Sequence, residues 1–184
     1  MQFTGDIYFN FDTYDVWRIY SFLLRGSQAG RVAVSVEWRA FLIDDVETDG
    51  EELPTEARPL AACEAVRHTY PEQYDRYARS LLTMAYQEKD SPGSKKILAV
   101  AAHVAGLDAD EVLVLAKDPG LGLLRRATED ARALGVTKVP TIVRQGPPVH
   151  VKMNAASNYG DPVARLELIN RMIDDDGMWE LSKP

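Results

Sequence analysis

The sequence predicts an α/β fold in which strands from both ends of the chain form one sheet and a block of helices is inserted between them. Residues 7–11 and 32–38 alternate apolar and polar side chains, which is typical of strands, and a helical pattern separates them. Residues 57–118 show helical patterning only. We therefore expect a sheet-containing domain from residues 1–56 and 119–184, with residues 57–118 as a helical insertion.

The N-terminal part reads as strand, helix, strand. After the first strand, Asp12 or Thr13 is placed to cap a helix, because short polar side chains bind the unpaired N–H groups of a first turn. The helix has an apolar stripe at helical spacing, and we expect it to end at Gly26. A second strand with valines at alternate positions follows.

The middle of the chain begins with an acidic, proline-containing stretch, residues 44–59, which we interpret as a surface loop. Prolines, capping residues and glycines then divide the helical block into segments. These segments are expected at residues 58–68, from Pro71, from Ser91-Pro92 to about residue 105, from Asp108, and from 118 to 134.

The C-terminal part contains the stretch around which the chain is organised. Gly135 is placed to end the helix that follows the insertion, and Pro140 opens a strand at residues 141–144 that turns into a second strand at 149–153. A loop at 154–159 precedes a helix that begins at Asp161-Pro162, and the acidic tail follows. This order of elements is that of a thioredoxin fold with an inserted all-helical subdomain.

Composition narrows the function classes. Hydrophobic residues make up 46% and charged residues 27%, as in ordinary globular proteins. The formal net charge of −7 argues against nucleic acid or an anionic membrane as partner. The N-terminus lacks the pattern of a signal peptide, and no window approaches a membrane span, so we expect a cytoplasmic protein.

The chain has one cysteine, Cys63, so it forms no intrachain disulfide and no cysteine-based metal cluster. Its three histidines lack the spacing of known metal motifs, and we predict no metal.

Three stretches resemble the DsbA-like thioredoxin-fold family, whose relatives include FrnE-type oxidoreductases, kappa-class glutathione transferases and 2-hydroxychromene-2-carboxylate isomerases. Residues 7–11 with the helix after them are similar to the first strand and active-site helix of that family. Residues 36–42 are similar to its second strand, often WRPFxL, and residues 135–143 to its GV-x-x-VPT-x-V loop, which carries a cis-proline. The family's redox motif, C-P-x-C, should follow residue 12, but residues 13–16 are Thr-Tyr-Asp-Val, so both sulfurs are missing.

The resemblance implies a site at the start of the first helix and at the proline loop. In the glutathione-using relatives a serine begins the motif beside the cofactor's thiolate, so Thr13 and Asp15 are the catalytic candidates. Asp12 and Asp15 would also repel a thiolate at that helix end. The alternative is that these residues only cap and stabilise the helix. Residues for thiol or substrate binding are Asp12, Tyr14, Trp17, Val139 and Pro140.

Two functions stay open. The first is binding of a small thiol or thiol conjugate, with glutathione or mycothiol as the candidate thiol, and with transferase or isomerase chemistry that uses the ligand's sulfur. The second is a non-catalytic binding or assembly module on a thioredoxin scaffold. Dithiol-disulfide exchange is excluded because it needs an attacking and a resolving thiol. A reactive Cys63 is a third, weaker alternative, and a homodimer stays open.

Overall fold

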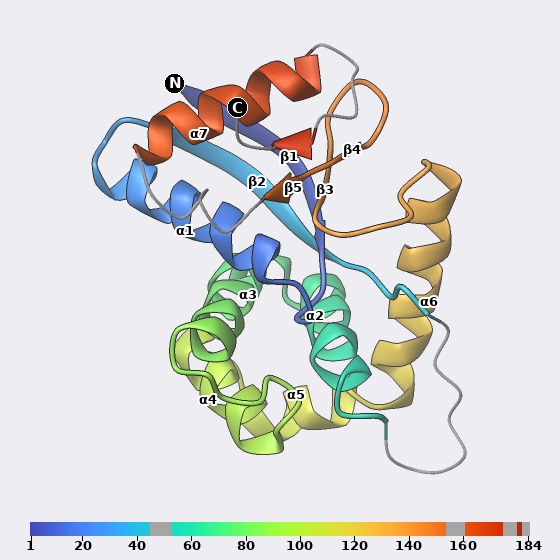
Figure 1. The fold of residues 1–184 in the computed structure, drawn as a ribbon. Helices are drawn as coiled ribbons and strands as arrows, with labels where there is room; N and C mark the ends of the chain where they lie inside the picture. The colour runs from blue at the N-terminus through green and yellow to red at the C-terminus, as the bar shows by residue number, and fades with distance from the viewer. Residues whose placement is uncertain (45–52, 154–160, 175–179, 182–184) are drawn as a thin grey trace. The chain divides into compact units, whose positions relative to one another are not determined.

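The computed structural model describes residues 1–44, 53–153, 161–174 and 180–181 (Figure 1). By contacts, the chain divides into two compact units, Met1–Trp38 with Arg132–Pro184, and Arg39–Ala131. The first unit contains the sheets and the second is helical. The insertion expected at residues 57–118 lies inside the second unit. Parts of the expected loops, residues 45–52 and 154–159, and the tail at 175–179 lie outside the described residues.

The main sheet has four strands in the order β2-β1-β3-β4. Strand β3 lies antiparallel to both of its neighbours, with Ile142 opposite Ile7 of β1 and Val149 of β4. A second, two-stranded sheet pairs β5 and β6 in parallel. The strands are β1 Gln2–Phe9, β2 Ala33–Ala40, β3 Thr141–Val143, β4 Val149–His150, β5 Lys152–Met153 and β6 Glu180–Leu181.

The hairpin expected after Pro140 is present, but its second strand is shorter than the sequence predicts. We expected one strand through residues 149–153, whereas β4 ends at His150. The next N–H group, that of Val151, donates to the carbonyl oxygen of Pro140 at 3.0 Å. This hydrogen bond does not belong to the ladder between β3 and β4. The residues after it, Lys152 and Met153, pair with β6 in the second sheet instead.

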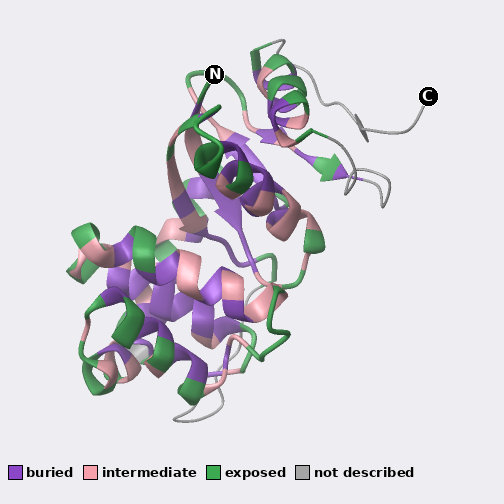
Figure 2. Cartoon of the chain, turned by 90° about the vertical axis from the view of Figure 1, so that its left-hand side faces the viewer, coloured by how far each residue is buried: buried purple, intermediate pink, exposed green. Residues whose placement is uncertain are grey.

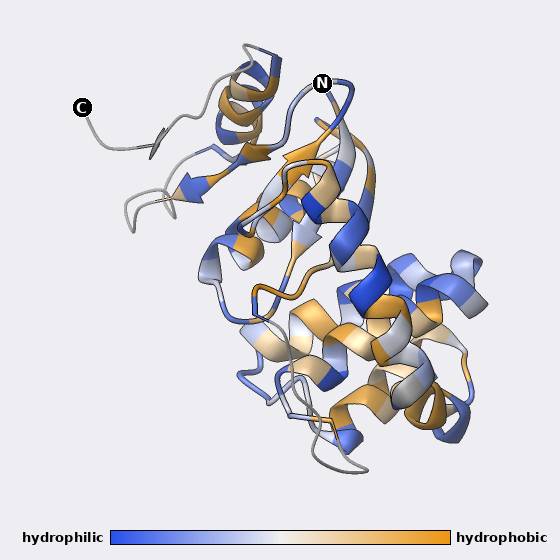
Figure 3. Ribbon diagram, turned by 90° about the vertical axis from the view of Figure 1, so that its right-hand side faces the viewer, coloured by the Kyte–Doolittle hydropathy of each residue, from blue (hydrophilic) through white to orange (hydrophobic). Residues whose placement is uncertain are grey.

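Helices α1 (Tyr14–Gln28) and α7 (Pro162–Asp174) contact each other in the first unit. Aromatic rings connect α1 to the sheet, with Trp38 of β2 at 5.7 Å from Phe9 and 5.9 Å from Tyr20 between ring centroids. The central strands are accordingly the most buried part of this unit (Figure 2). The apolar stripe predicted for α7 is present (Figure 3). Asp161 accepts the N–H of Val163 at the start of this helix.

The prediction that Gly26 ends the first helix is wrong. Helix α1 continues to Gln28, and Gly26 is buried within it. A Cβ atom at this position would lie 2.6 Å from Cγ2 of Val32. The glycine is therefore explained by the close approach of the returning chain, a contact that helix-stop patterns do not detect.

The second unit consists of α2 Ala57–Thr69, α3 Pro71–Tyr86, α4 Lys95–Ala105, α5 Ala109–Leu115 and most of α6 Asp118–Ala133. Asp108 caps α5 by accepting the N–H of Glu111 at 2.9 Å, and Gly106 ends α4 in the left-handed conformation, both as predicted. Helix α4 begins at Lys95, three residues later than Pro92 suggested.

The end of β2 is held by two buried side chains of this unit. The N–H of Ala40 donates to Glu64 at 3.2 Å, and the N–H of Leu42 donates to Thr128 at 3.2 Å. Glu64 is also paired with Arg67 at 2.7 Å. Each backbone donor thus has a partner, as buried N–H groups require.

Candidate functional site at the start of helix α1 and the Pro140 loop

The turn between β1 and α1 is closed by Asn10, which is buried. Its side-chain oxygen accepts the N–H of Asp12 at 3.1 Å, and its amide nitrogen donates to the Asp12 carboxylate at 3.2 Å. Thr13 occupies the N-cap position with extended backbone angles, but its hydroxyl makes no capping hydrogen bond. One of the two interpretations required Asp12 or Thr13 to cap the helix through its side chain. Neither residue does so.

Asp15, in the first turn of α1, is tied to β5. One carboxylate oxygen accepts from Arg18 at 2.5 Å, and the other accepts the backbone N–H of Met153 at 3.2 Å. Arg18 also donates to the carbonyl oxygen of Met153 at 2.8 Å. Since the Asp15 and Arg18 side chains are only 15% and 13% exposed, this pair is a fixed part of the structure.

The aromatic candidates differ in their surroundings. Tyr14 is exposed, with the guanidinium of Arg18 over its ring at 5.0 Å. Trp17 is half-buried and packs on Tyr20, with 5.4 Å between the ring centroids. Trp17 thus contributes to packing on α1, while Tyr14 lies at the surface beside the helix start.

The loop before β3 is buried at Val139 and Pro140, and the peptide bond between them is cis. The Thr141 hydroxyl donates to the carbonyl oxygen of Lys138 at 2.7 Å. Among the residues that the structure describes, none forms a hydrogen bond to the backbone N–H or C=O of Val139. This donor and acceptor are therefore available to pair with an extended ligand.

His150 lies beside this loop, and the sequence analysis did not select it. Its Nδ1 atom is 3.0 Å from the carbonyl oxygen of Pro140. Burial lowers the pKa of this imidazole, the Pro140 carbonyl opposes that shift, and Lys138 lowers the pKa further. The signal that would have found His150 is strand register, because Thr141 pairs with His150 directly after the loop.

The predicted site residues therefore belong to one compact unit. Asp15 connects the first turn of α1 to Met153, three residues after His150, which in turn contacts Pro140. Thr13 lies two residues before Asp15 at the same helix end. The structure thus links the helix start and the proline loop through two hydrogen bonds and the short stretch of backbone between His150 and Met153.

Cys63 lies outside this unit. It is fully buried in α2, and burial raises the pKa of its thiol well above the usual value. Within the described part of the chain, no three His, Cys, Asp or Glu side chains gather in a way that would hold a metal ion.

None of the helices in the described ranges is both long enough and apolar enough to cross a bilayer. No family model matches the chain, and no curated protein matches it.

Solved structures do match over almost the whole chain. DsbA from Xylella fastidiosa is 13% identical with a TM-score of 0.59, covering 94% of this chain and 85% of its own. The oxidoreductase NmDsbA1 from N. meningitidis is 10% identical with a TM-score of 0.54, covering 94% and 84%. The cytosolic disulfide reductase DsbM from Pseudomonas aeruginosa, solved with GSH, is 12% identical with a TM-score of 0.57, covering 94% and 100%. The chain therefore has a DsbA-like thioredoxin fold with an inserted helical region, and its single cysteine leaves it without a CxxC pair.

Proposed function

We propose that this protein binds a small thiol or thiol conjugate along Val139 and at the start of α1. The observation that carries the proposal is the unpaired backbone of Val139, for which no described residue supplies a partner. An extended peptide-like ligand binds such an edge by exchanging N–H and C=O hydrogen bonds with it. Glutathione has peptide groups of this kind, and mycothiol is the alternative low-molecular-weight thiol.

Thr13 would contact the ligand's sulfur. It occupies the N-cap position of α1, and the helix dipole favours an anion at this end. A hydroxyl that donates to a bound thiolate stabilises the charged form and lowers its pKa. In this proposal the ligand supplies the thiol for a transfer or isomerisation.

Asp15 acts as a positioning residue in this proposal. Its carboxylate already holds Arg18 and the Met153 N–H, so it is poorly placed to take a proton from a substrate. Pairing with Arg18 also reduces the repulsion that we expected between Asp15 and an incoming thiolate. Asp12, bonded to Asn10, would lie at the edge of the site.

Similarity to DsbM supports glutathione as the first ligand to test, since that neighbour was solved with GSH and is described as cytosolic. A cytoplasmic location, where such thiols are kept reduced, is part of the proposal.

Titration of reduced and S-alkylated glutathione and mycothiol, followed by heteronuclear NMR, tests this. We expect saturable shifts of the Val139 and Thr13 amides in the wild type. Thr13→Ala should weaken binding of the free thiol more than of the S-alkylated form, and Thr13→Ser should restore it. Shifts absent at millimolar ligand, or spread over the surface, would rule out the thiol site.

The second candidate is a non-catalytic binding module. It is favoured by the bonds of Asp15 to Arg18 and to the Met153 N–H, which make this carboxylate a poor general base. In that case Val139 would still respond to peptide-like ligands. Thr13→Ala would change neither their affinity nor any turnover of a thiol conjugate.

A further inference from the structure

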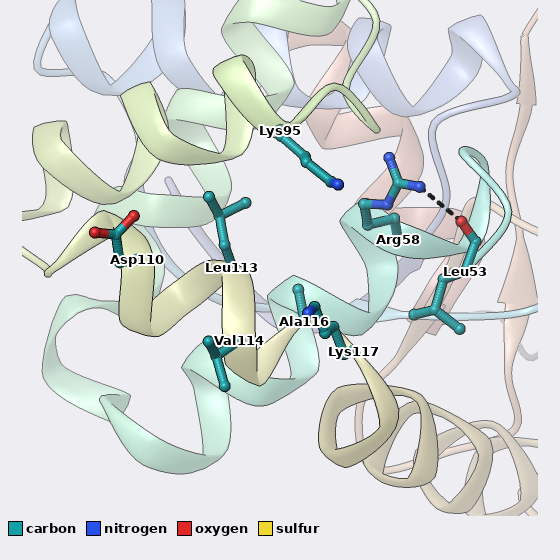
Figure 4. Close-up of a pocket in the computed structure, with 8 residues that line it drawn as sticks. All are labelled: Leu53, Arg58, Lys95, Asp110, Leu113, Val114, Ala116 and Lys117. Carbon is teal, nitrogen blue, oxygen red and sulfur yellow. Dashed lines mark hydrogen bonds between the residues drawn. The ribbon is translucent and has the colours of Figure 1, made fainter. Parts of the chain in front are cut away.

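A separate cavity lies in the helical unit, between the starts of α2 and α4 and the helix α5 (Figure 4). Its volume is about 250 Å³, slightly below the usual range for drug-sized ligands. Four apolar and four charged side chains line it. The lining residues are Leu53, Arg58, Lys95, Asp110, Leu113, Val114, Ala116 and Lys117.

The charges at this cavity are mostly positive. In Figure 4 the amine end of Lys95 points from α4 toward Arg58 of α2, whose guanidinium is directed to Leu53, while Asp110 lies on the far side. Lys117 is a third cation in the lining. Such a cluster is notable in a chain of net charge −7. Because like charges repel, an anion between Lys95 and Arg58 would stabilise both of them.

The guanidinium of Arg58 is already held in place. It donates to the carbonyl oxygens of Gly93 and Leu53, each at 2.8 Å. These bonds fix the position of the positive charge, so a ligand would bind it at little cost in side-chain entropy. They also make Arg58 a structural residue and therefore a poor choice for a test substitution.

The start of α4 increases the positive potential. This helix has no acidic residue in its first turn, and Ser94 at its N-cap makes no capping hydrogen bond, whereas the acidic Glu56 occupies the N-cap position of α2. A cation in the first turn is opposite to the usual preference, because the dipole already places partial positive charge there. Potential from the start of α4 and from Lys95 therefore adds at one end of the cavity.

We propose that this cavity binds a small carboxylate with an apolar alkyl or aryl body. The carboxylate would lie between Lys95 and Arg58, and the body would pack against Leu113 and Ala116. Apolar walls with a few charged groups that fix orientation are typical of small-molecule sites. A single negative charge fits better than a phosphate dianion, because the apolar walls would penalise a second charge.

Octanoate and 3-phenylpropionate are the probes, and the neutral amides of the same acids and acetate are the controls. In titrations followed by heteronuclear NMR, both acids should shift the amides of α4 and α5 saturably at up to about 10 mM. The neutral amide ligands and acetate should bind at least fivefold more weakly than the two acids. If neither acid binds, or if the neutral amides bind as tightly, the proposal is wrong.

Lys95→Gln should weaken binding of both acids about five- to tenfold, as expected for loss of a charge-assisted contact. Lys96→Gln, which removes a neighbouring exposed charge that does not line the cavity, should leave binding unchanged. Leu113→Phe, which fills the cavity without a change in charge, should abolish binding while circular dichroism shows an intact fold. Equal effects of the two lysine variants, or full binding by Leu113→Phe, would overturn the proposed site.

Discussion

The carboxylate of Asp15 accepts the backbone N–H of Met153 at 3.2 Å, across 138 residues of sequence. This bond connects the first turn of α1 to the strand that follows the β3–β4 hairpin. It links the helix start to the segment that follows His150, which contacts Pro140. The geometry of the candidate site therefore depends on one acidic side chain that the sequence analysis treated as a catalytic candidate.

Asp15→Asn should destabilise the protein by roughly 1–2 kcal/mol, because it weakens a charge-assisted hydrogen bond and a largely buried ion pair. Urea unfolding followed by circular dichroism measures this. The control is Asp75→Asn, which removes an exposed pair with Arg79 and should cost less than about 0.5 kcal/mol. Equal losses in the two variants would mean that the contact with Met153 contributes nothing.

Stability should fall as the pH is lowered from the ordinary histidine pKa of 6.5 toward the lower pKa of His150 in the folded protein. Burial depresses this pKa, so in that window the unfolded state binds more protons than the folded state. Above 6.5 both states are neutral and the effect vanishes. Asp15, Lys138 and Lys152 also act on the imidazole, with Asp15 opposing the shift.

Urea unfolding at several pH values should therefore show a smaller slope for His150→Gln than for the wild type. His103→Gln, at an exposed position on α4, should keep the wild-type slope. An NMR titration in which His150 ionises above 6.5 would contradict the prediction.

Gly26→Ala should destabilise by roughly 1–2 kcal/mol, because overlap with Val32 outweighs the gain in helix propensity. Gly122→Ala in α6 is the matched control. A Cβ there meets nothing within 4 Å, so the same substitution should stabilise by about 0.5–1 kcal/mol. Thermal unfolding of both variants decides the point, and a stabilised Gly26→Ala would show that Val32 moves aside.

Cys63 should not react with an aromatic disulfide reagent under native conditions and should react fully in denaturant. Burial keeps the thiol both inaccessible and protonated, whereas the thiolate is the nucleophile. Lys96→Cys, at an exposed position, supplies the positive control for reactivity. Rapid native modification of Cys63 would revive the hypothesis that this cysteine acts with an external thiol.

Sequence patterns predicted the structure correctly where a few neighbouring residues decide it. Asp108 caps α5, Gly106 ends α4, and Asp161 begins α7, because capping and left-handed turns are decided within one helical turn. The DsbA-like fold was likewise predictable from the order of helices and strands and from the stretch around Pro140.

Features that depend on distant contacts were not predictable in the same way. Gly26 resembles a helix stop, but its role is set by Val32. His150 joins the candidate site only because the β3–β4 register places it beside Pro140. The roles of Thr13 and Val139 in ligand binding remain predictions that the titrations test.

Synthesis on the ribosome adds a consequence of the sheet order. Strand β1 borders β3, so one edge of β1 has no partner until residue 143 has been translated. At about 5–20 residues per second, that interval is of the order of ten seconds. The helical unit, Arg39–Ala131, is continuous in sequence and is completely translated before β3. The nascent chain therefore has its helical unit available for folding while β1 still exposes an unpaired strand edge.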